Sequence, residues 1–303
     1  MAPLPLVYHP DYGVPLPEGH RFPMAKFQRL YETLSLQLPG QFRAFTPHLP
    51  LQTSLELVHD PNFIQDYCLG TLGAQEQRRI GLPWSEALVK RTLTAVGGTL
   101  LTARLALTHG IALNTAGGTH HAYPTFGSGF CIFNDFAIAA RVLLEEGKIQ
   151  RVLILDLDVH QGDGTAYIFA QDPRVFTVSI HCEKNFPHRK QPSDLDLALP
   201  EGTSDQRYLK TLRANLPTIL TLSQPDLMLY NAGADPHRDD RLGKLALTDT
   251  GLLQRDCLVL DTCRQAKLPV ACVIGGGYDR DLQRLVNRHA LLFWAAHHVF
   301  QTP

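Results

Sequence analysis

The chain of 303 residues has no long apolar run and no excess of charge of one sign. No stretch approaches the roughly 20 consecutive apolar residues that a membrane-spanning helix requires, and the start, Met-Ala-Pro-Leu-Pro, lacks the basic and apolar regions of a signal peptide. A formal net charge of −1 argues against nucleic-acid binding, because domains with that task usually carry a strong basic excess. These absences predict a cytoplasmic protein with no membrane partner and no direct nucleic-acid partner.

Cysteine is scarce, and no two cysteines form a Cys-x-x-Cys motif. The six cysteines are scattered: Cys68, Cys131, Cys182, Cys257, Cys263 and Cys272. This distribution is typical of reduced, mostly buried thiols and argues against disulfides or a zinc ribbon. The sequence also has no Gly-x-Gly-x-x-Gly, P-loop, Gly-x-Ser-x-Gly or His-Glu-x-x-His motif, so none of the enzyme classes that these motifs define is indicated.

The composition is that of a soluble globular protein, with 44% hydrophobic and 19% charged residues. From residue 111 onward, apolar runs that predict strands alternate with longer patterns that predict helices. Strands are expected at 111–115, 152–159, 175–180, 226–231 and 270–274, and helices at 134–146, 204–223 with an interruption at Pro217, 248–267 and 279–300. Such alternation is typical of an α/β fold with one mostly parallel sheet covered by helices on both faces. No repeat or linker divides the chain, so one domain is expected over residues 1–303.

The first 50 residues are rich in proline and aromatic residues, and we expect packed loops around one helix, from about residue 23 to residue 38. Asp60-Pro61 is typical of a helix start, which predicts a short helix from there to Gly70. Ser85 opens a longer helical pattern that ends at His109-Gly110.

Residues 151–164, Arg-Val-Leu-Ile-Leu-Asp-Leu-Asp-Val-His-Gln-Gly-Asp-Gly, carry the strongest functional signal. If 152–159 is a strand, its side chains alternate between two faces, so Asp156, Asp158 and His160 project from one side. They lie at the carboxyl end of the apolar run, where open α/β sheets form their ligand crevice, and a divalent metal is expected there. The alternative is that the aspartates cap a turn and the histidine binds nothing. Calcium is not expected, because Gln161 stands where an EF-hand loop needs glycine.

Three other apolar runs are also followed by short loops with reactive residues. The loop after 111–115 contains Gly117-Gly118-Thr119-His120-His121, the loop after 226–231 contains Ala232-Gly233-Ala234-Asp235, and the loop after 270–274 contains Gly275-Gly276-Gly277-Tyr278. Loops at the carboxyl ends of parallel strands meet at one edge of the sheet. Two histidines, four carboxylates including Asp163, and one tyrosine are therefore expected in one crevice.

A metal bound by Asp158, His160 and Asp235 would have two anionic ligands and one neutral ligand. Positions would remain open for water and a substrate oxygen, as a catalytic metal requires. Zn²⁺, Fe²⁺ and Co²⁺ all suit such ligands.

The adjacent His120 and His121 suit proton transfer, because imidazole titrates near neutrality. Asp156 and Asp163 are their candidate partners, each of which would hold one imidazole in its tautomer. The alternative is a turn pair with one ring buried and the other exposed. Tyr278 has a similar alternative as an aromatic residue that packs on the C-terminal helix, but the three glycines before it favour close approach to a ligand.

The chain resembles the histone deacetylase family in five motifs, which occur in the family's order and extend over nearly the whole chain. The motifs are Gly118–His121, Gly129–Cys131, Asp156–Gly164, Asn231–Asp235 and Gly275–Tyr278. Two further segments, Arg79–Trp84 and Asp239–Gly243, are most similar to the class IV deacetylases and their bacterial relatives. The resemblance implies an arginase-like three-layer α/β/α fold with a parallel sheet of about eight strands.

The resemblance also implies residue roles. The zinc ligands would be Asp158, His160 and Asp235. The catalytic residues would be the pairs His120–Asp156 and His121–Asp163, with Tyr278 as hydrogen-bond donor to the substrate carbonyl. A narrow acyl tunnel would be lined by Gly129, Phe130, Phe186 and Leu242. A structural potassium ion is implied near Asp156, partly on backbone oxygens of Asp158, His160, Ser179 and Ile180.

The sequence departs from the better-known deacetylase classes at three places. Gln161 stands where a second histidine is common, Asp135 stands where asparagine is common, and the loop from His181 to Phe186 is shortened. None of these is an implied zinc ligand, but the shortened loop bears on the match of Phe186.

The expected function is zinc-dependent hydrolysis of an acylated amine by metal-activated water, with acyl-lysine in a protein or peptide as substrate and an acetyl or longer acyl group. One alternative keeps this chemistry but takes a small acetylated polyamine or another metabolite. Another, from a different class, is a non-catalytic acyl-lysine binder, and the complete set of ligands and acid–base residues argues against it. The sequence leaves the oligomeric state open.

Overall fold

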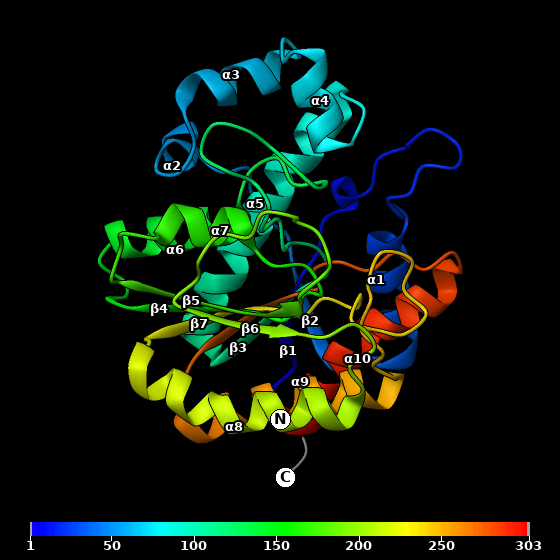
Figure 1. The fold of residues 1–303 in the computed structure, drawn as a ribbon, viewed down its shortest axis with the longest axis vertical. Coiled ribbons are helices and arrows are strands. Elements are labelled where there is room, and N and C mark those ends of the chain that lie inside the picture. Colours follow the sequence, from blue (N-terminus) through cyan, green and yellow to red (C-terminus); the bar gives the residue numbers. More distant parts are fainter. Residues whose placement is uncertain (1, 302–303) are drawn as a thin grey trace.

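The computed structural model describes residues 2–301 and places eight strands in one sheet, in the order β2-β1-β3-β8-β7-β4-β5-β6 (Figure 1). The strands are β1 (Leu4–Val7), β2 (Phe42–Phe45), β3 (Ile111–Asn114), β4 (Val152–Asp156), β5 (Val175–Cys182), β6 (Leu195–Leu199), β7 (Leu227–Asn231) and β8 (Val270–Val273). Every neighbouring pair is parallel, so all carboxyl ends lie at the same edge. The predicted α/β fold with a parallel sheet is confirmed.

Helices cover both faces of the sheet. They are α1 (Lys26–Gln37), α2 (Gln52–Glu56), α3 (Pro61–Leu69), α4 (Ala74–Ile80), α5 (Glu86–His109), α6 (Asp135–Glu145), α7 (Asp163–Phe169), α8 (Asp205–Ser223), α9 (Asp249–Ala266) and α10 (Leu282–Gln301). Helices α5, α6 and α7 lie on one face and α1, α8, α9 and α10 on the other, while α2, α3 and α4 lie beyond α5 and α6 (Figure 1). Within residues 2–301, no helix has the length and apolar character needed to cross a membrane.

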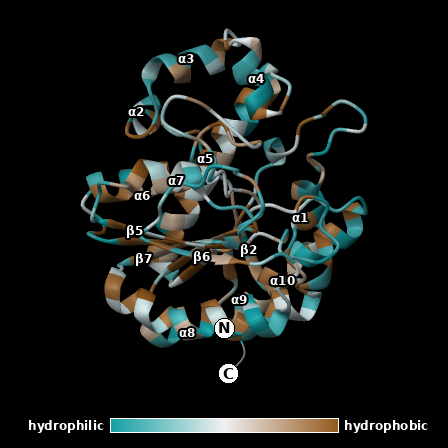
Figure 2. Cartoon of the chain, viewed as in Figure 1, coloured by the Kyte–Doolittle hydropathy of each residue, from teal (hydrophilic) through white to brown (hydrophobic). Residues whose placement is uncertain are grey.

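The central strands are apolar along their whole length because helices shield both faces. Every residue of β3, β4, β7 and β8 is buried, and Figure 2 shows hydrophobic residues concentrated in the sheet. Strands of this kind appear in a sequence as continuous apolar runs, which is why the pattern alone located them.

Capping contacts confirm two predicted helices. The Asp60 side chain accepts hydrogen bonds from two backbone N–H groups in the first turn of α3, and Gly70 ends that helix with a φ of 73°. Ser85 caps α5 in the same way, and Gly110, with a φ of 82°, ends it. A side-chain cap of this kind stabilises a helix by about 1 kcal/mol.

The expectation for the first 50 residues is wrong in part. The helix is present as α1, but residues 4–7 and 42–45 form β1 and β2 instead of loops. Both strands have only four residues, and β2 is an edge strand in which Arg43 is exposed. They are strands because β1 pairs with the distant β3, as in the alignment of Leu6 with Leu113, and such long-range pairing leaves little local pattern.

The strand predicted at 152–159 ends at Asp156. The carboxylate of Asp156 accepts the backbone N–H of Asp158 at 3.1 Å, which turns the chain out of the sheet. Asp158 and His160 therefore lie in a loop and not along a strand face. Helix α7, before β5 in the sequence, and strand β6, after it, were not predicted. Strand β5 extends to Cys182, two residues beyond its predicted end.

Helix α8 runs through Pro217 without the predicted interruption. Pro217 and Arg213, whose carbonyl loses its intrahelical partner, both face solvent, where water can replace the missing bond. The buried stripe of Leu212, Leu216 and Ile219 continues across the proline and holds the helix on the sheet.

Candidate functional site

Four neighbouring strands, β3, β8, β7 and β4, end in the loops that the sequence analysis singled out. Because these strands are adjacent and parallel, loops 116–121, 274–278, 232–235 and 157–163 meet at one edge of the sheet. The charged and imidazole side chains of these loops are at most 7% exposed: His120, His121, Asp156, Asp158, His160, Asp163 and Asp235.

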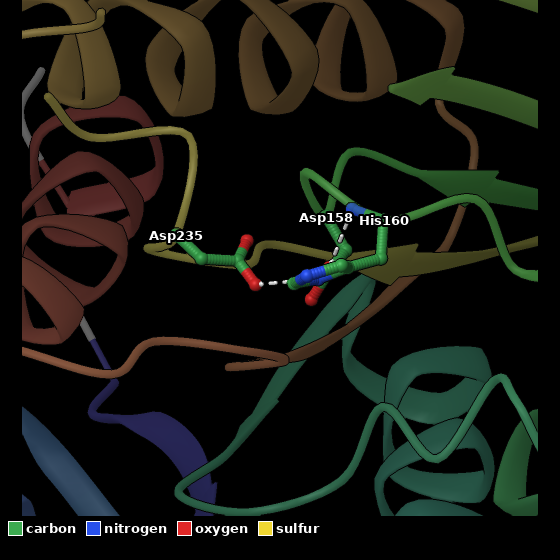
Figure 3. A group of neighbouring side chains, drawn as sticks. All are labelled: Asp158, His160 and Asp235. Carbon is green, nitrogen blue, oxygen red and sulfur yellow. Dashed lines mark hydrogen bonds and ion pairs between the residues drawn. The ribbon is translucent and has the colours of Figure 1, made fainter. Parts of the chain in front are cut away.

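Asp158, His160 and Asp235 form a cluster whose potential ligand atoms all lie within 4.8 Å of one another. The Nδ1 atom of His160 is 2.9 Å from Asp158 Oδ1 and 3.2 Å from Asp235 Oδ2 (Figure 3). Backbone N–H groups orient the carboxylates, since Gly276 donates to Asp158 Oδ2 at 2.7 Å and Val159 donates to Asp235 Oδ1 at 2.9 Å. Among residues 2–301, no other group of three such side chains has this spacing.

The surroundings of this cluster suit a cation. Burial and the neighbouring Asp158 raise the pKa of Asp235 to about 7. Burial lowers the pKa of His160, but its contacts with the two carboxylates outweigh burial and raise that pKa to about 10. The Oδ2 atom of Asp235 is buried, has no well-formed hydrogen bond within residues 2–301 and faces His160 Nδ1 at 3.2 Å. A divalent ion between these atoms would neutralise the paired carboxylates and satisfy this oxygen, so the residues fit a metal.

The predicted His–Asp pairs are both present. His120 Nδ1 lies 2.6 Å from Asp156 Oδ2, and His121 Nδ1 lies 2.6 Å from Asp163 Oδ1. The two rings are 4.1 Å apart between centroids, and both are buried, which rules out the turn pair with one exposed ring. The Nε2 atom of each imidazole remains free of its carboxylate and can meet a substrate or water.

The two imidazoles differ in proton affinity. Burial lowers the pKa of His120, but the charges of Asp156 and Asp158 outweigh burial and raise it to about 9. Burial, together with the positive charge of His120, lowers the pKa of His121 to about 4. Near neutral pH the pair therefore consists of a cationic His120 and a neutral His121 that can accept a proton.

Tyr278 lies beside the Asp-His-Asp cluster and before α10, which begins at Leu282. Its ring centroid is 6.3 Å from that of His160 and 5.9 Å from that of Phe130. Burial raises the pKa of the Tyr278 hydroxyl well above its usual value, so the group stays protonated and can donate a hydrogen bond.

The glycines before Tyr278 are required by close approach. A Cβ atom on Gly276 would clash with carboxylate oxygens of both Asp158 and Asp235. The backbone N–H of Tyr278 is held by Asp240 Oδ2 at 2.7 Å. The glycine loop thus lets the backbone approach the cluster closely, and Asp240 fixes the position of the Tyr278 backbone.

A cavity of about 520 Å³ leads from the surface to His121, His160 and Tyr278. Its lining includes all the residues predicted for an acyl tunnel: Gly129, Phe130, Phe186 and Leu242. The turn at Gly129 and Phe130 has positive φ values of 54° and 67°, and a Cβ on Gly129 would lie 2.8 Å from the His121 ring. Phe186 packs edge-on against His121 at 4.8 Å between centroids, so the shortened loop still brings it to the cavity.

The residues implied for potassium lie in the carboxyl halves of β4 and β5 and in the loop that follows β4. Asp156 is aligned with Ser179 across β4 and β5, and Ile180 is the next residue of β5. The two strands thus bring these residues close together, and the potassium site stays a prediction.

The two atypical residues have structural partners near the cluster. Asp135 accepts hydrogen bonds from the backbone N–H groups of Gly118 and Thr119, at 2.9 and 2.8 Å, and so holds the loop that carries both histidines. Gln161 donates to Asp196 Oδ1 at 2.8 Å.

Two residues that the sequence analysis missed support the site. Arg255 on α9 is 1% exposed and donates to the carbonyl oxygens of Gly233, at 2.7 Å, and Leu157, at 3.4 Å, so it links the two loops that bear the Asp-His-Asp cluster. The sequence signal that could have found Arg255 is its place among the apolar residues on the buried face of the predicted helix. The Tyr123 hydroxyl donates to Asp163 Oδ2 at 3.0 Å, and nothing in the sequence indicated this contact.

Residues 20–293 match the family described as histone deacetylase domain. The chain is 59% identical over 299 residues to an uncharacterised protein of Picosynechococcus sp., a match that covers 98% of this chain and 99% of that one. It is 34% identical over 194 residues to histone deacetylase 2 of Arabidopsis thaliana, covering 63% of this chain and 50% of that protein, so it spans about half the length of that relative.

A solved structure, that of the HDA15 HD domain, has the same fold. It is 20% identical in sequence, superposes with a TM-score of 0.78, and covers 95% of this chain and 89% of that one. The protein is therefore of the arginase/deacetylase-like α/β class. The match over residues 20–293 shows further that the chain belongs to the histone deacetylase family. It is a hydrolase that acts on amide bonds, in a family whose general reaction is hydrolytic deacetylation and whose members are generally metal-dependent.

Proposed function

We propose that this protein is a zinc-dependent lysine deacylase, which hydrolyses the amide bond between an acyl group and the side chain of a lysine in a protein or peptide. The observation that carries this proposal is the placement of the Asp-His-Asp cluster, two His–Asp pairs and a tyrosine around the inner end of one cavity. The proposed location is the cytoplasm.

Asp158, His160 and Asp235 would hold the ion. A bound zinc ion would supply a Lewis acid for the substrate carbonyl and would lower the pKa of water. The buried carboxylates are already oriented by backbone N–H groups, so little reorganisation is needed for binding.

The two histidines would have different roles in the reaction. His121, neutral near pH 7, would take the proton from the attacking water and deliver it to the leaving lysine amine. Asp163 holds His121 Nδ1 and leaves Nε2 for the reaction. His120, whose pKa is raised by the charge of its partner Asp156, would stabilise the negative charge that develops on the substrate oxygen.

Tyr278 would donate a hydrogen bond to the same developing oxyanion. Its neutral hydroxyl and its position beside His160 suit that role. Such a donor lowers the barrier because the hydrogen bond strengthens as the carbonyl becomes tetrahedral.

The uncharged wall of Gly129, Phe130, Phe186 and Leu242 would receive the acyl-lysine stem. The resemblance to the class IV deacetylases, together with the roughly 0.8 kcal/mol gained by each methylene that a sufficiently deep tunnel buries, leads us to expect that acyl groups longer than acetyl are accepted.

A series of fluorogenic peptides with acetyl-, octanoyl- and myristoyl-lysine tests the proposal. Turnover should disappear after the metal is removed with a chelator and return when Zn²⁺ is added. Undiminished turnover by metal-free protein would contradict the metal role. Turnover of acetylated polyamines but of no peptide would favour the metabolite alternative, and peptide binding without any turnover would favour the non-catalytic binder. A clear preference for acetyl would contradict the expected acyl length.

A further inference from the structure

Basic side chains surround the mouth of the cavity. Its lining includes five that are all exposed: Arg21, Arg78, Arg79, Lys184 and Lys244. Among residues 2–301, no aspartate or glutamate lines this cavity. The whole chain, with 28 basic and 29 acidic residues, has almost no net charge. The mouth is therefore a local concentration of positive charge on a nearly neutral protein.

Most of these charges are not neutralised by the protein itself. Lys244 forms an ion pair with Glu201 at 2.7 Å. The guanidinium group of Arg79 stacks on the ring of Phe126 at 4.5 Å, a contact that leaves its charge in place. Arg21, Arg78, Arg79 and Lys184 have no carboxylate at ion-pair distance within residues 2–301. Their charge is available to a ligand.

Backbone hydrogen bonds fix one side of the mouth to the cavity wall. The carbonyl of Arg79 accepts the N–H of Gly129 at 3.2 Å, and the carbonyl of Ile80 accepts the N–H of Phe130 at 2.8 Å. The end of α4, with Arg78 and Arg79, is thereby held directly against the Gly129–Phe130 turn.

The other side of the mouth is fixed by Asn185. Its side chain donates to the carbonyl of Leu242 at 2.6 Å and accepts the N–H of Lys244 at 3.0 Å. Lys184 and Lys244 are thus held beside the cavity-lining Leu242. These hydrogen bonds fix the backbone that carries the two lysines next to the cavity.

The charge lies outside the part of the cavity that would hold the acyl group. The wall residues Gly129, Phe130, Phe186 and Leu242 are uncharged, whereas the basic side chains are exposed at the entrance. They can therefore contact what flanks the acylated lysine but not a group buried in the tunnel.

We propose that this mouth selects acyl-lysines flanked by acidic residues and discriminates against lysine- and arginine-rich segments. The inference rests on the deacylase function proposed above and specifies its substrate class. Clefts lined by charge of one sign raise the local concentration and association rate of oppositely charged ligands, and like charges brought together are repelled.

Three peptides that differ only in the four residues around one acyl-lysine, all Glu, all Gln or all Lys, provide the test. At low salt, kcat/KM should fall from Glu to Gln to Lys, by on the order of tenfold per step, and the differences should shrink in 0.5 M salt because exposed charges are screened. The variant Arg78→Glu/Lys184→Glu leaves three positive and two negative side chains at the mouth, so its preference for the Glu peptide should be largely lost. Neither Arg78 nor Lys184 has an ion pair within residues 2–301, so folding should be retained.

The matched control is Arg207→Glu/Lys210→Glu, the same change of charge on α8, which lies across the sheet from α4 (Figure 1). This control should keep the preference for the Glu peptide. Equal kcat/KM for the three peptides with the wild-type protein at low salt, or an undiminished preference for the Glu peptide in the Arg78/Lys184 variant, would overturn the inference while leaving the deacylase function intact. Failure to hydrolyse any peptide would overturn both. Inhibition by a single-stranded oligonucleotide, without any preference among the peptides, would assign the mouth to nucleic acid instead.

Discussion

Tyr278 is the residue whose proposed role separates most cleanly from folding and metal binding. Its hydroxyl makes no hydrogen bond with residues 2–301, and its ring packing would be kept by phenylalanine. We expect Tyr278→Phe to lower kcat by ~10²–10³, because one donor to the oxyanion is lost. Since this hydrogen bond belongs to the transition state, kcat/KM should fall to the same extent, while metal content and Tm stay unchanged.

A matched control is Tyr31→Phe, which keeps a ring that stacks on Tyr8 at 3.8 Å and should leave turnover unchanged. Near-normal turnover by Tyr278→Phe with full metal content would show that the tyrosine only packs, and the mechanism would lose its hydrogen-bond donor to the oxyanion.

Sequence motifs located the reactive residues because these follow apolar runs at the carboxyl ends of strands. The structure brings His120, His121 and Tyr278 to the Asp-His-Asp cluster as the loops predicted. The supporting contacts of Arg255 and Tyr123 were not predicted, because neither residue belongs to one of the five motifs and both contacts depend on how α9 and the 121–131 loop pack.

At the scale of elements, α9 holds the site through Arg255. Removing the guanidinium alone would leave Asp256 as an unpaired buried charge, so the better test is Arg255→Met/Asp256→Asn, which removes both charges and keeps an acceptor for the Tyr230 hydroxyl. We expect this variant to fold and to bind its metal on the order of 10–100-fold more weakly, because the loops before Asp158 and Asp235 lose their shared anchor.

Metal affinity of this variant is measured by competition with a chelator, alongside Tm. A folded double variant with wild-type metal affinity would show that α9 does not position the cluster.

The start of α6 depends on a neutral histidine. His59 is 2% exposed, accepts the backbone N–H of Asn134 at 2.9 Å and contacts the carbonyl of Tyr123 at 3.0 Å. Burial lowers its pKa to about 4, below the value of about 6.5 expected in the unfolded chain. The stabilisation is therefore complete above pH 6.5 and is lost as the pH falls toward 4.

Unfolding in urea at pH 7 and pH 4.5 measures this effect. His59→Gln keeps a donor and an acceptor but cannot titrate, so the loss of unfolding free energy between the two pH values should be about 2 kcal/mol smaller than in the wild type. An equal loss in both proteins would mean that His59 is not the group that senses acid.

Elements differed in how well their local pattern marked them. The buried strands β3, β4, β7 and β8 appear as apolar runs, and α3 and α5 have side-chain caps. β1, β2 and β6 are short or partly exposed strands toward the two ends of the sheet, where pairing partners decide the conformation more than the residues do. The interruption predicted at Pro217 is wrong for a different reason: proline disfavours a helix interior locally, but the packing of α8 on the sheet keeps the helix continuous.

At the scale of the whole molecule, the parallel sheet explains why one site forms. Parallel pairing brings the carboxyl ends of β3, β8, β7 and β4 together, and only that edge gathers buried carboxylates and imidazoles into a cluster that fits a metal among residues 2–301. The prediction that residues 1–303 make one domain stays a prediction. The three-layer fold follows from the alternation of strands and helices, and the resemblance added the number of strands.

The most direct test of the central claim is the metal content of the purified protein, measured by elemental analysis together with deacylase activity. We expect about one divalent transition-metal ion per chain in the wild type and in Asp261→Asn, a partly exposed aspartate on α9 that lies outside the cluster. Asp235→Asn, which keeps the side chain's size but weakens a ligand, should lose the metal and the activity together. Two tightly bound ions per wild-type chain, or an active Asp235→Asn protein without metal, would contradict a deacylase with a single metal at Asp158, His160 and Asp235.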